Sequence, residues 1–191
     1  LDLIAAADPA AATALASAQI DEATTMTDRL AALSVLAQIP GRARENALER
    51  FAETYRLEPL VLDKWLAIQA GIPEAGTLER IRRLQRHPAF SMTNPNRVRA
   101  LIGSFSMGNP TQFNRPDGAG YALVAERILA LDRTNPQVAA RLLTAFGSWR
   151  NLEPKRRDRA KSTLLEIRVV PGLSRDVGDI LERTLAGPAK P

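Results

Sequence analysis

The stretch that decides the fold is residues 94–103, NPNRVRALIG, and its pattern returns at residues 135–142, NPQVAARL. In both, the asparagine side chain can accept a hydrogen bond from the free amides of a first helical turn, and the proline supplies a fixed φ where no amide donor is needed. Both stretches therefore predict the start of a helix. Long polar side chains follow directly inside the two caps, namely Arg97, Arg99, Gln137 and Arg141. Because the first turn is the positive end of a helix, we expect this arrangement to suit a carboxylate or a peptide carbonyl.

The apolar residues behind each cap decide which of these polar side chains can share a cavity. In the first helix, the spacing i, i+3, i+4, i+7 gives a buried stripe of Val98, Leu101, Ile102 and Phe105. At about 100° per residue, this stripe sets Arg97 and Arg99 on opposite flanks, so only one of them faces a given cavity. In the second helix, Gln137 and Arg141 are four residues apart and share a side, which makes them the better pair for one ligand.

Outward from these two stretches, helical periodicity covers nearly the whole chain, and no segment alternates in the manner of a strand. The expected helices cover residues 9–20, 27–38, 42–56, 59–70, 77–86, 95–106, 118–132, 136–150, 154–169 and 174–186. Helix hairpins that recur every ~30 to 40 residues are typical of an armadillo or HEAT superhelix. We therefore expect an all-α fold, a single α-solenoid domain of antiparallel helix pairs over residues 1–191.

The composition limits the chemistry that the chain can carry. An apolar fraction of 45% with 25% charged residues is typical of a globular protein. The chain has no cysteine, which excludes disulfides and thiolate sites and is compatible with the cytosol, so we expect a cytoplasmic protein. Its only histidine, His87, precedes a proline and is interpreted as the end of a helix rather than a metal ligand. No apolar run reaches the ~18 to 20 residues that cross a bilayer, so we expect no membrane span.

The net charge of +5 raises the question of nucleic acid. Two basic clusters stand out, residues 80–86 and 155–161, but neither has interleaved aromatic residues on which bases could stack. We therefore interpret them as solvated helix faces and expect no nucleic acid partner. A free-standing α-solenoid that binds a protein or nucleic acid through an arginine-rich face remains the alternative.

Three other patterns have structural interpretations. Residues 117–121, DGAGY, lack the third glycine and the preceding strand of a dinucleotide site, so they predict a capped helix start. Glu45, Glu49 and Glu53 repeat every four residues among arginines, which favours a surface ladder of ion pairs over a catalytic acid pair. Trp65 and Trp149 fall on apolar stripes and are expected in the core.

Several segments closely resemble the C-terminal helical domain of bacterial aminopeptidase N. The resemblance is carried by residues 87–105 (HPAFSMTNPNRVRALIGSF), 117–121 (DGAGY) and 131–142 (LDRTNPQVAARL). Residues 26–33 (MTDRLAAL) and 62–65 (LDKW) are also similar to that family. The likeness runs from about residue 20 to the end of the chain and keeps the same order.

The resemblance implies a zinc-dependent exopeptidase that removes N-terminal amino acids from peptides. This domain would close over the active site and line the substrate cavity as the C-terminal fragment of a larger chain. The family's His-Glu-x-x-His zinc motif and its Gly-x-Met-Glu-Asn segment do not occur here. The zinc and the catalytic residues would therefore belong to an upstream catalytic domain, the implied partner, and this segment would bind no metal.

The resemblance also implies which residues touch the peptide. Gln137 would lie near the pocket for the first side chain. Arg99 and Arg141 would engage downstream carbonyls or the terminal carboxylate. We expect these three as substrate-binding residues and no catalytic residue in this segment.

Overall fold

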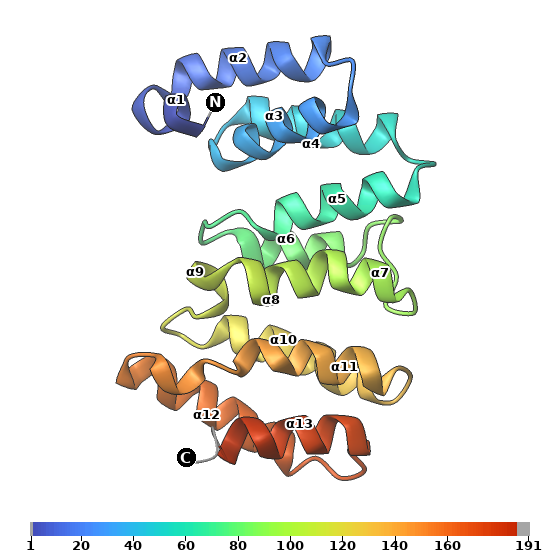
Figure 1. Cartoon of the computed structure of the whole chain (residues 1–191), viewed down its shortest axis with the longest axis vertical. Helices are drawn as coiled ribbons and strands as arrows, with labels where there is room; N and C mark the ends of the chain where they lie inside the picture. Colours follow the sequence, from blue (N-terminus) through green and yellow to red (C-terminus); the bar gives the residue numbers. More distant parts are fainter. Residues whose placement is uncertain (1, 187–191) are drawn as a thin grey trace.

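The computed structural model describes residues 2–186, and over this range the chain contains helices and no strand, which confirms the all-α class (Figure 1). The α-helices are α1 (Asp2–Ala7), α2 (Pro9–Glu22), α3 (Met26–Gln38), α4 (Arg42–Thr54), α5 (Pro59–Ala70), α6 (Thr77–Leu84), α7 (Pro95–Val98), α8 (Ser104–Gly108), α9 (Pro110–Phe113), α10 (Ala119–Asp132), α11 (Pro136–Leu143), α12 (Pro154–Arg168) and α13 (Arg175–Ala186). A π-helical turn, η1 (Arg99–Gly103), joins α7 to α8, and two 3₁₀ turns, η2 (Thr144–Phe146) and η3 (Trp149–Asn151), follow α11.

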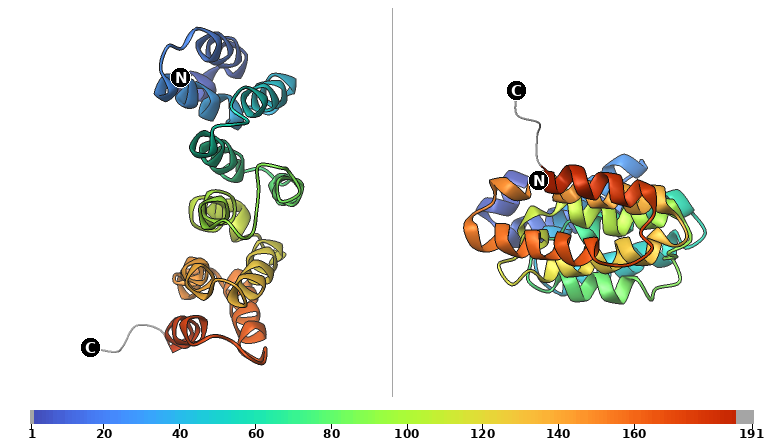
Figure 2. Two further views of the ribbon diagram at one scale, coloured as in Figure 1. Left: turned by 90° about the vertical axis from the view of Figure 1, so that its right-hand side faces the viewer. Right: turned by 90° about the horizontal axis from the view of Figure 1, so that it is seen from below.

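The helices follow one another along the long axis of the molecule, from α1 at one end to α13 at the other (Figure 1). Seen from the side, helices from α4 onward alternate between two layers (Figure 2). One layer holds α5, α8, α11 and α13, and the other holds α4, α6, α10 and α12. No helix of the described chain is long and apolar enough to span a bilayer.

One hydrophobic core runs between the two layers, and the predicted stripe lies at its centre. Val98, Leu101, Ile102 and Phe105 are all fully buried. Both tryptophans lie in the core as expected, and each indole N–H has a carbonyl partner, Leu48 O for Trp65 at 2.8 Å and Thr184 O for Trp149 at 3.0 Å. A buried aromatic cluster of edge-to-face and tilted contacts, Phe105, Phe113, Tyr121 and Phe146, joins the middle of the molecule to its C-terminal end.

The expected helix at 95–106 differs from the observed structure in two ways. The π-turn η1 interrupts it, and it runs on to Gly108 before a further asparagine–proline pair, Asn109 and Pro110, starts α9. The expected helix at 136–150 ends as an α-helix at Leu143 and continues as 3₁₀ turns. The short helices α1 and α9 were not expected, because one or two turns of helix give too little periodicity to recognise.

The helix start predicted at residues 117–121 is confirmed. Gly118 has φ +77°, a left-handed value that favours glycine, and the Asp117 carboxylate accepts from Ala119 N at 3.0 Å. A Cβ on Gly120 would lie 2.3 Å from the carbonyl oxygen of Phe113, so α10 can pack closely on α9 only with glycine at this position.

The ion-pair ladder predicted on the surface of α4 is confirmed in part: Glu53 is exposed and pairs with Arg56, and Glu45 is exposed but also pairs with a residue of another helix. The Glu45 carboxylate accepts two hydrogen bonds from Arg80 of α6, at 2.6 and 2.9 Å, and this lowers the pKa of Glu45 below its ordinary value. Arg44 makes a two-pronged ion pair with Glu74, both bonds 3.0 Å long. Arg44 and Arg80 are both buried, so the first arginine of the basic cluster at 80–86 lies inside the molecule and not on a solvated face.

Candidate functional site

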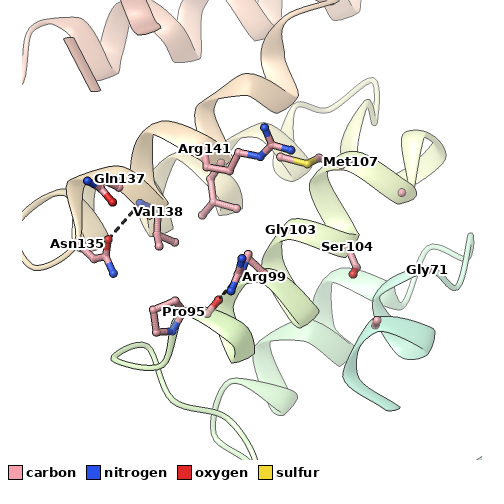
Figure 3. A pocket seen from close by; sticks show the side chains of 13 residues that line it. Gly71, Pro95, Arg99, Gly103, Ser104, Met107, Asn135, Gln137, Val138 and Arg141 are labelled. Carbon is pink, nitrogen blue, oxygen red and sulfur yellow. Dashed lines mark hydrogen bonds between the residues drawn. The ribbon is translucent and has the colours of Figure 1, made fainter. Parts of the chain in front are cut away.

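An open pocket of about 830 Å³ lies between α5, the α7–η1–α8 segment and α11 (Figure 3). All three predicted substrate-binding residues line it. The thirteen lining residues are Ala67, Gly71, Pro95, Arg99, Gly103, Ser104, Met107, Gly108, Asn135, Gln137, Val138, Arg141 and Leu142.

Asparagine caps fix two of the pocket's edges, as the sequence predicts. Asn94 Oδ1 accepts from Asn96 N at 2.9 Å and from Arg97 N at 3.4 Å, which starts α7. Asn135 Oδ1 accepts from Val138 N at 3.2 Å and starts α11. Each cap satisfies amides that the first turn leaves free, so the chain enters both helices at a fixed angle.

The two arginines of the first helix separate as the periodicity predicts. Arg97 is turned inward, with 9% of its surface exposed, and its guanidinium donates to Asp63 Oδ1 at 2.7 Å and to Pro59 O at 2.6 Å. Arg99 is exposed at the pocket, where it donates to the Asn96 side chain and to Pro95 O. Arg97 therefore ties this helix to α5, and Arg99 is the one available to a ligand.

The π-turn η1 forms the floor of the pocket. It begins at Arg99 and ends at Gly103, and both residues line the hollow. A Cβ on Gly103 would lie 3.8 Å from Arg99 Cβ and 4.0 Å from Leu142 Cδ2, so a side chain at this position would make only ordinary van der Waals contacts with its own turn and with α11. Single π-turns inside helices are frequent at functional sites. Nothing in the sequence except the glycine signals this turn.

Gln137 and Arg141 lie one helical turn apart on the same side of α11, and both are exposed. Within residues 2–186 Arg141 makes no ion pair, and no acidic residue stands among the lining residues of the pocket. Two guanidinium groups thus face a hollow without a compensating carboxylate. Such a site can hold a carboxylate or a peptide carbonyl through charge-assisted hydrogen bonds.

The sequence did not predict the wall contributed by α5 and α8. Ala67 and Gly71 come from the end of α5, and Ser104, Met107 and Gly108 come from α8. These residues are small or apolar and carry no local signature of a binding site. Only the packing of distant helices brings them beside Arg141.

His87 is placed as predicted, just beyond the end of α6. Its backbone N–H donates to Leu84 O at 3.1 Å, and its ring Nδ1 accepts from Ala89 N at 3.1 Å. The centroid of its ring lies 5.1 Å from that of the Trp65 ring. These contacts account for the residue as part of the loop between α6 and α7.

Comparisons with known proteins agree on one family. Residues 1–186 match the protein family described as "Domain of unknown function (DUF3458_C) ARM repeats". The chain is 44% identical over 163 residues to aminopeptidase N of Caulobacter vibrioides, covering 85% of this chain and 19% of that protein. It is 38% identical over 174 residues to aminopeptidase N of Escherichia coli, covering 90% and 20% respectively.

A solved structure is also similar. The crystal structure of Legionella pneumophila aminopeptidase A in complex with aspartic acid matches with a TM-score of 0.86 and 34% identity. The match covers 91% of this chain and 20% of that one. The chain therefore spans about a fifth of the length of the relatives that it matches.

Proposed function

The chain belongs to the aminopeptidase N family as its C-terminal helical domain, and on this premise we propose that it lines the substrate cavity of a zinc-dependent aminopeptidase. The domain would close over the active site of an upstream catalytic domain in the same polypeptide. The whole protein would remove N-terminal amino acids from peptides. We assign to this chain the binding and enclosure of the peptide.

The observation that carries the proposal is the convergence of Arg99, Gln137 and Arg141 on one pocket without acidic lining residues. Two of these residues come from α11 and one from η1, about forty residues apart in the sequence. A peptide that enters this pocket with its downstream end would meet both guanidinium groups. Each charge-assisted hydrogen bond to a carbonyl or terminal carboxylate contributes about 1.5–3 kcal/mol when water is largely excluded.

The proposed zinc site is assigned to the upstream domain and not to this chain. Among the side chains described, no three of histidine, cysteine, aspartate or glutamate gather closely enough to hold a metal ion. We therefore assign the metal to the proposed catalytic domain and derive no chemical step from this chain. Its contribution is to position the peptide and to reduce the water around it, which strengthens electrostatic interactions in the site.

The test uses the full-length enzyme and matched peptides that end in a carboxylate or in an amide. Arg141→Ala is expected to lower kcat/KM about tenfold for the carboxylate peptides, which corresponds to one lost charge-assisted hydrogen bond, and to change the amides less. Gln137→Ala is expected to change the ratio of alanyl to arginyl substrates. Arg86→Ala, an exposed arginine that does not line this pocket, is the control. Unchanged kinetics in both pocket variants would reject these roles.

The alternative function, binding of nucleic acid through an arginine-rich face, predicts affinity that falls steeply with salt. The contacts of the basic cluster at residues 80–86 argue against nucleic acid binding. Arg80 is buried against Glu45, and Arg82 pairs with Glu79, so two of its four arginines are already neutralised.

A further inference from the structure

The pocket has two chemically different ends. Figure 3 shows Pro95, Asn135 and Gln137 at one end and Met107, Ser104 and Gly71 toward the other, with the Arg141 guanidinium lying between the two groups. The polar end carries amide groups and the start of α11. The second end, which we call the Met107 end, is lined by Ala67, Gly71, Gly103, Ser104, Met107 and Gly108.

Met107 is unusual among the residues of this end because 47% of a large apolar side chain is left exposed inside a pocket. The other strongly exposed apolar side chains of the described chain, such as Leu57, Leu60 and Val169, do not line this hollow. A methionine side chain is flexible and polarizable, so it adapts to aliphatic partners of different shape. Exposed apolar surface of this kind is stabilised when a ligand covers it.

Glycines leave the space beside Met107 open. A Cβ on Gly108 would meet nothing within 4 Å, and a Cβ on Gly103 would make only ordinary contacts. The room at this end is therefore not filled by the protein itself. An aliphatic side chain of a ligand can occupy it without displacing a residue.

Charge decides between the kinds of side chain that could enter. Figure 3 shows the Met107 and Arg141 side chains pointing toward one another. Arg99 adds a second guanidinium to the same pocket, and no carboxylate of the described lining offsets either of them. A lysine or arginine side chain would meet like charge here, whereas an aliphatic one would meet the sulfur and methylene groups of Met107.

We propose that Met107 is a specificity-determining residue, and that the Met107 end binds an aliphatic side chain of the peptide residue whose carboxylate Arg141 binds. The inference rests on the proposed function, because it needs a peptide in this pocket. The inference adds a substrate class to the proposed function: short peptides whose C-terminal residue is aliphatic are preferred over those ending in a small polar or basic residue.

The experiment compares the dipeptides Ala-Leu, Ala-Ser and Ala-Lys as substrates of the full-length enzyme. Met107→Ser is expected to lower the ratio of kcat/KM for Ala-Leu to that for Ala-Ser by about three- to tenfold. This is at and below the lower limit of the effect of a lost methylene contact in a closed hydrophobic pocket, because Met107 is only half covered. Met107→Leu, which keeps the apolar surface, is expected to retain the ratio. Val169→Ser, an exposed apolar residue away from the pocket, is the matched control.

The outcomes separate the two proposals. If Arg141→Ala lowers kcat/KM for all three dipeptides and Met107→Ser leaves their ratios unchanged, the specificity role is overturned while the proposed function stands. If neither variant has any effect, the peptide does not use this pocket and both fall. Because Met107 is half exposed, its substitution does not threaten the fold, and matching thermal unfolding curves would verify this.

Discussion

Three helices of the described chain begin at an asparagine–proline pair. The same substitution, asparagine to aspartate, at each of the three positions separates the capping role of the side-chain oxygen from any role of the side-chain NH2 group. At all three, the side-chain oxygen accepts from an amide of the first turn: Asn94 in α7, Asn109 in α9 and Asn135 in α11. Aspartate keeps this oxygen and adds negative charge at a helix N-terminus. Where the cap is the whole role, the change is expected to be neutral or to stabilise by about 0.3–1 kcal/mol.

Asn109 differs because its amide group is also used. It is 1% exposed, and its Nδ2 donates to Ala70 O at 2.9 Å and to Ile72 O at 2.8 Å, which ties the end of α8 to the end of α5. Asn109→Asp replaces these donors by an oxygen that repels both carbonyls. Ile72 O keeps a bond from the Thr77 hydroxyl at 2.6 Å, so Ala70 O bears most of the loss. Two lost hydrogen bonds and one unpaired carbonyl together cost about 2–4 kcal/mol.

The assay is denaturant unfolding of the three aspartate variants near neutral pH, with unchanged m values as the check that two-state comparison is valid. Asn109→Asp is expected to unfold at clearly lower denaturant, and Asn94→Asp and Asn135→Asp at the wild-type concentration or slightly above it. The deficit of Asn109→Asp is expected to shrink in acid, because a protonated carboxyl can again donate to one carbonyl. Equal midpoints for all three variants would refute the role assigned to the Asn109 amide.

Two further predictions concern charge. Glu74→Gln removes the carboxylate shared by two buried guanidinium groups and is expected to destabilise the chain by about 1–3 kcal/mol, whereas Glu79→Gln, at an exposed pair, costs about 0–1 kcal/mol; denaturant unfolding measures both. Hydrogen bonds from Arg115 and from the Ala119 amide lower the pKa of Asp117 to about 2, so its contribution to stability is complete above its ordinary pKa of 3.8 and is lost as the pH falls to about 2. Arg115→Ala is expected to raise that pKa toward 3.8, and a carboxyl NMR titration that left it unmoved would contradict the assignment.

Local patterns carried much of the fold and part of the site. The caps at Asn94 and Asn135 and the buried stripe through Phe105 follow from the chemistry of single turns and from helical spacing. The same spacing separated Arg97 from Arg99, and the structure shows which of the two reaches the pocket. These features depend only on residues a few positions apart, so they can be predicted from the local sequence.

What the sequence did not predict depends on contacts between distant helices. In the sequence Arg80 looks like part of an exposed basic face. In the structure it is buried, and its guanidinium donates to the carboxylate of Glu45, which lies thirty-five residues away along the chain. Met107 carries no polar signature, and it becomes part of a pocket only because α11 packs beside η1. The relative placement of helices is a property of the whole core, and no window along the chain contains it.

The caps also explain why the pocket can keep its shape although its polar side chains are exposed. Asn135 fixes the start of α11, which carries Gln137 and Arg141, and Asn94 fixes the start of the helix that carries Arg99. Asn109 ties the end of α8, beside Met107, to the two carbonyls that flank Gly71 of the opposite wall. Each wall is thus held at its edge by an asparagine bonded to backbone, and the side chains within remain free for a ligand. If the proposed peptide binding is correct, a substitution that loosens one of these asparagines is expected to weaken it before the chain unfolds. The reason is that a pocket between helix ends loses its geometry with a smaller displacement than a core loses its packing.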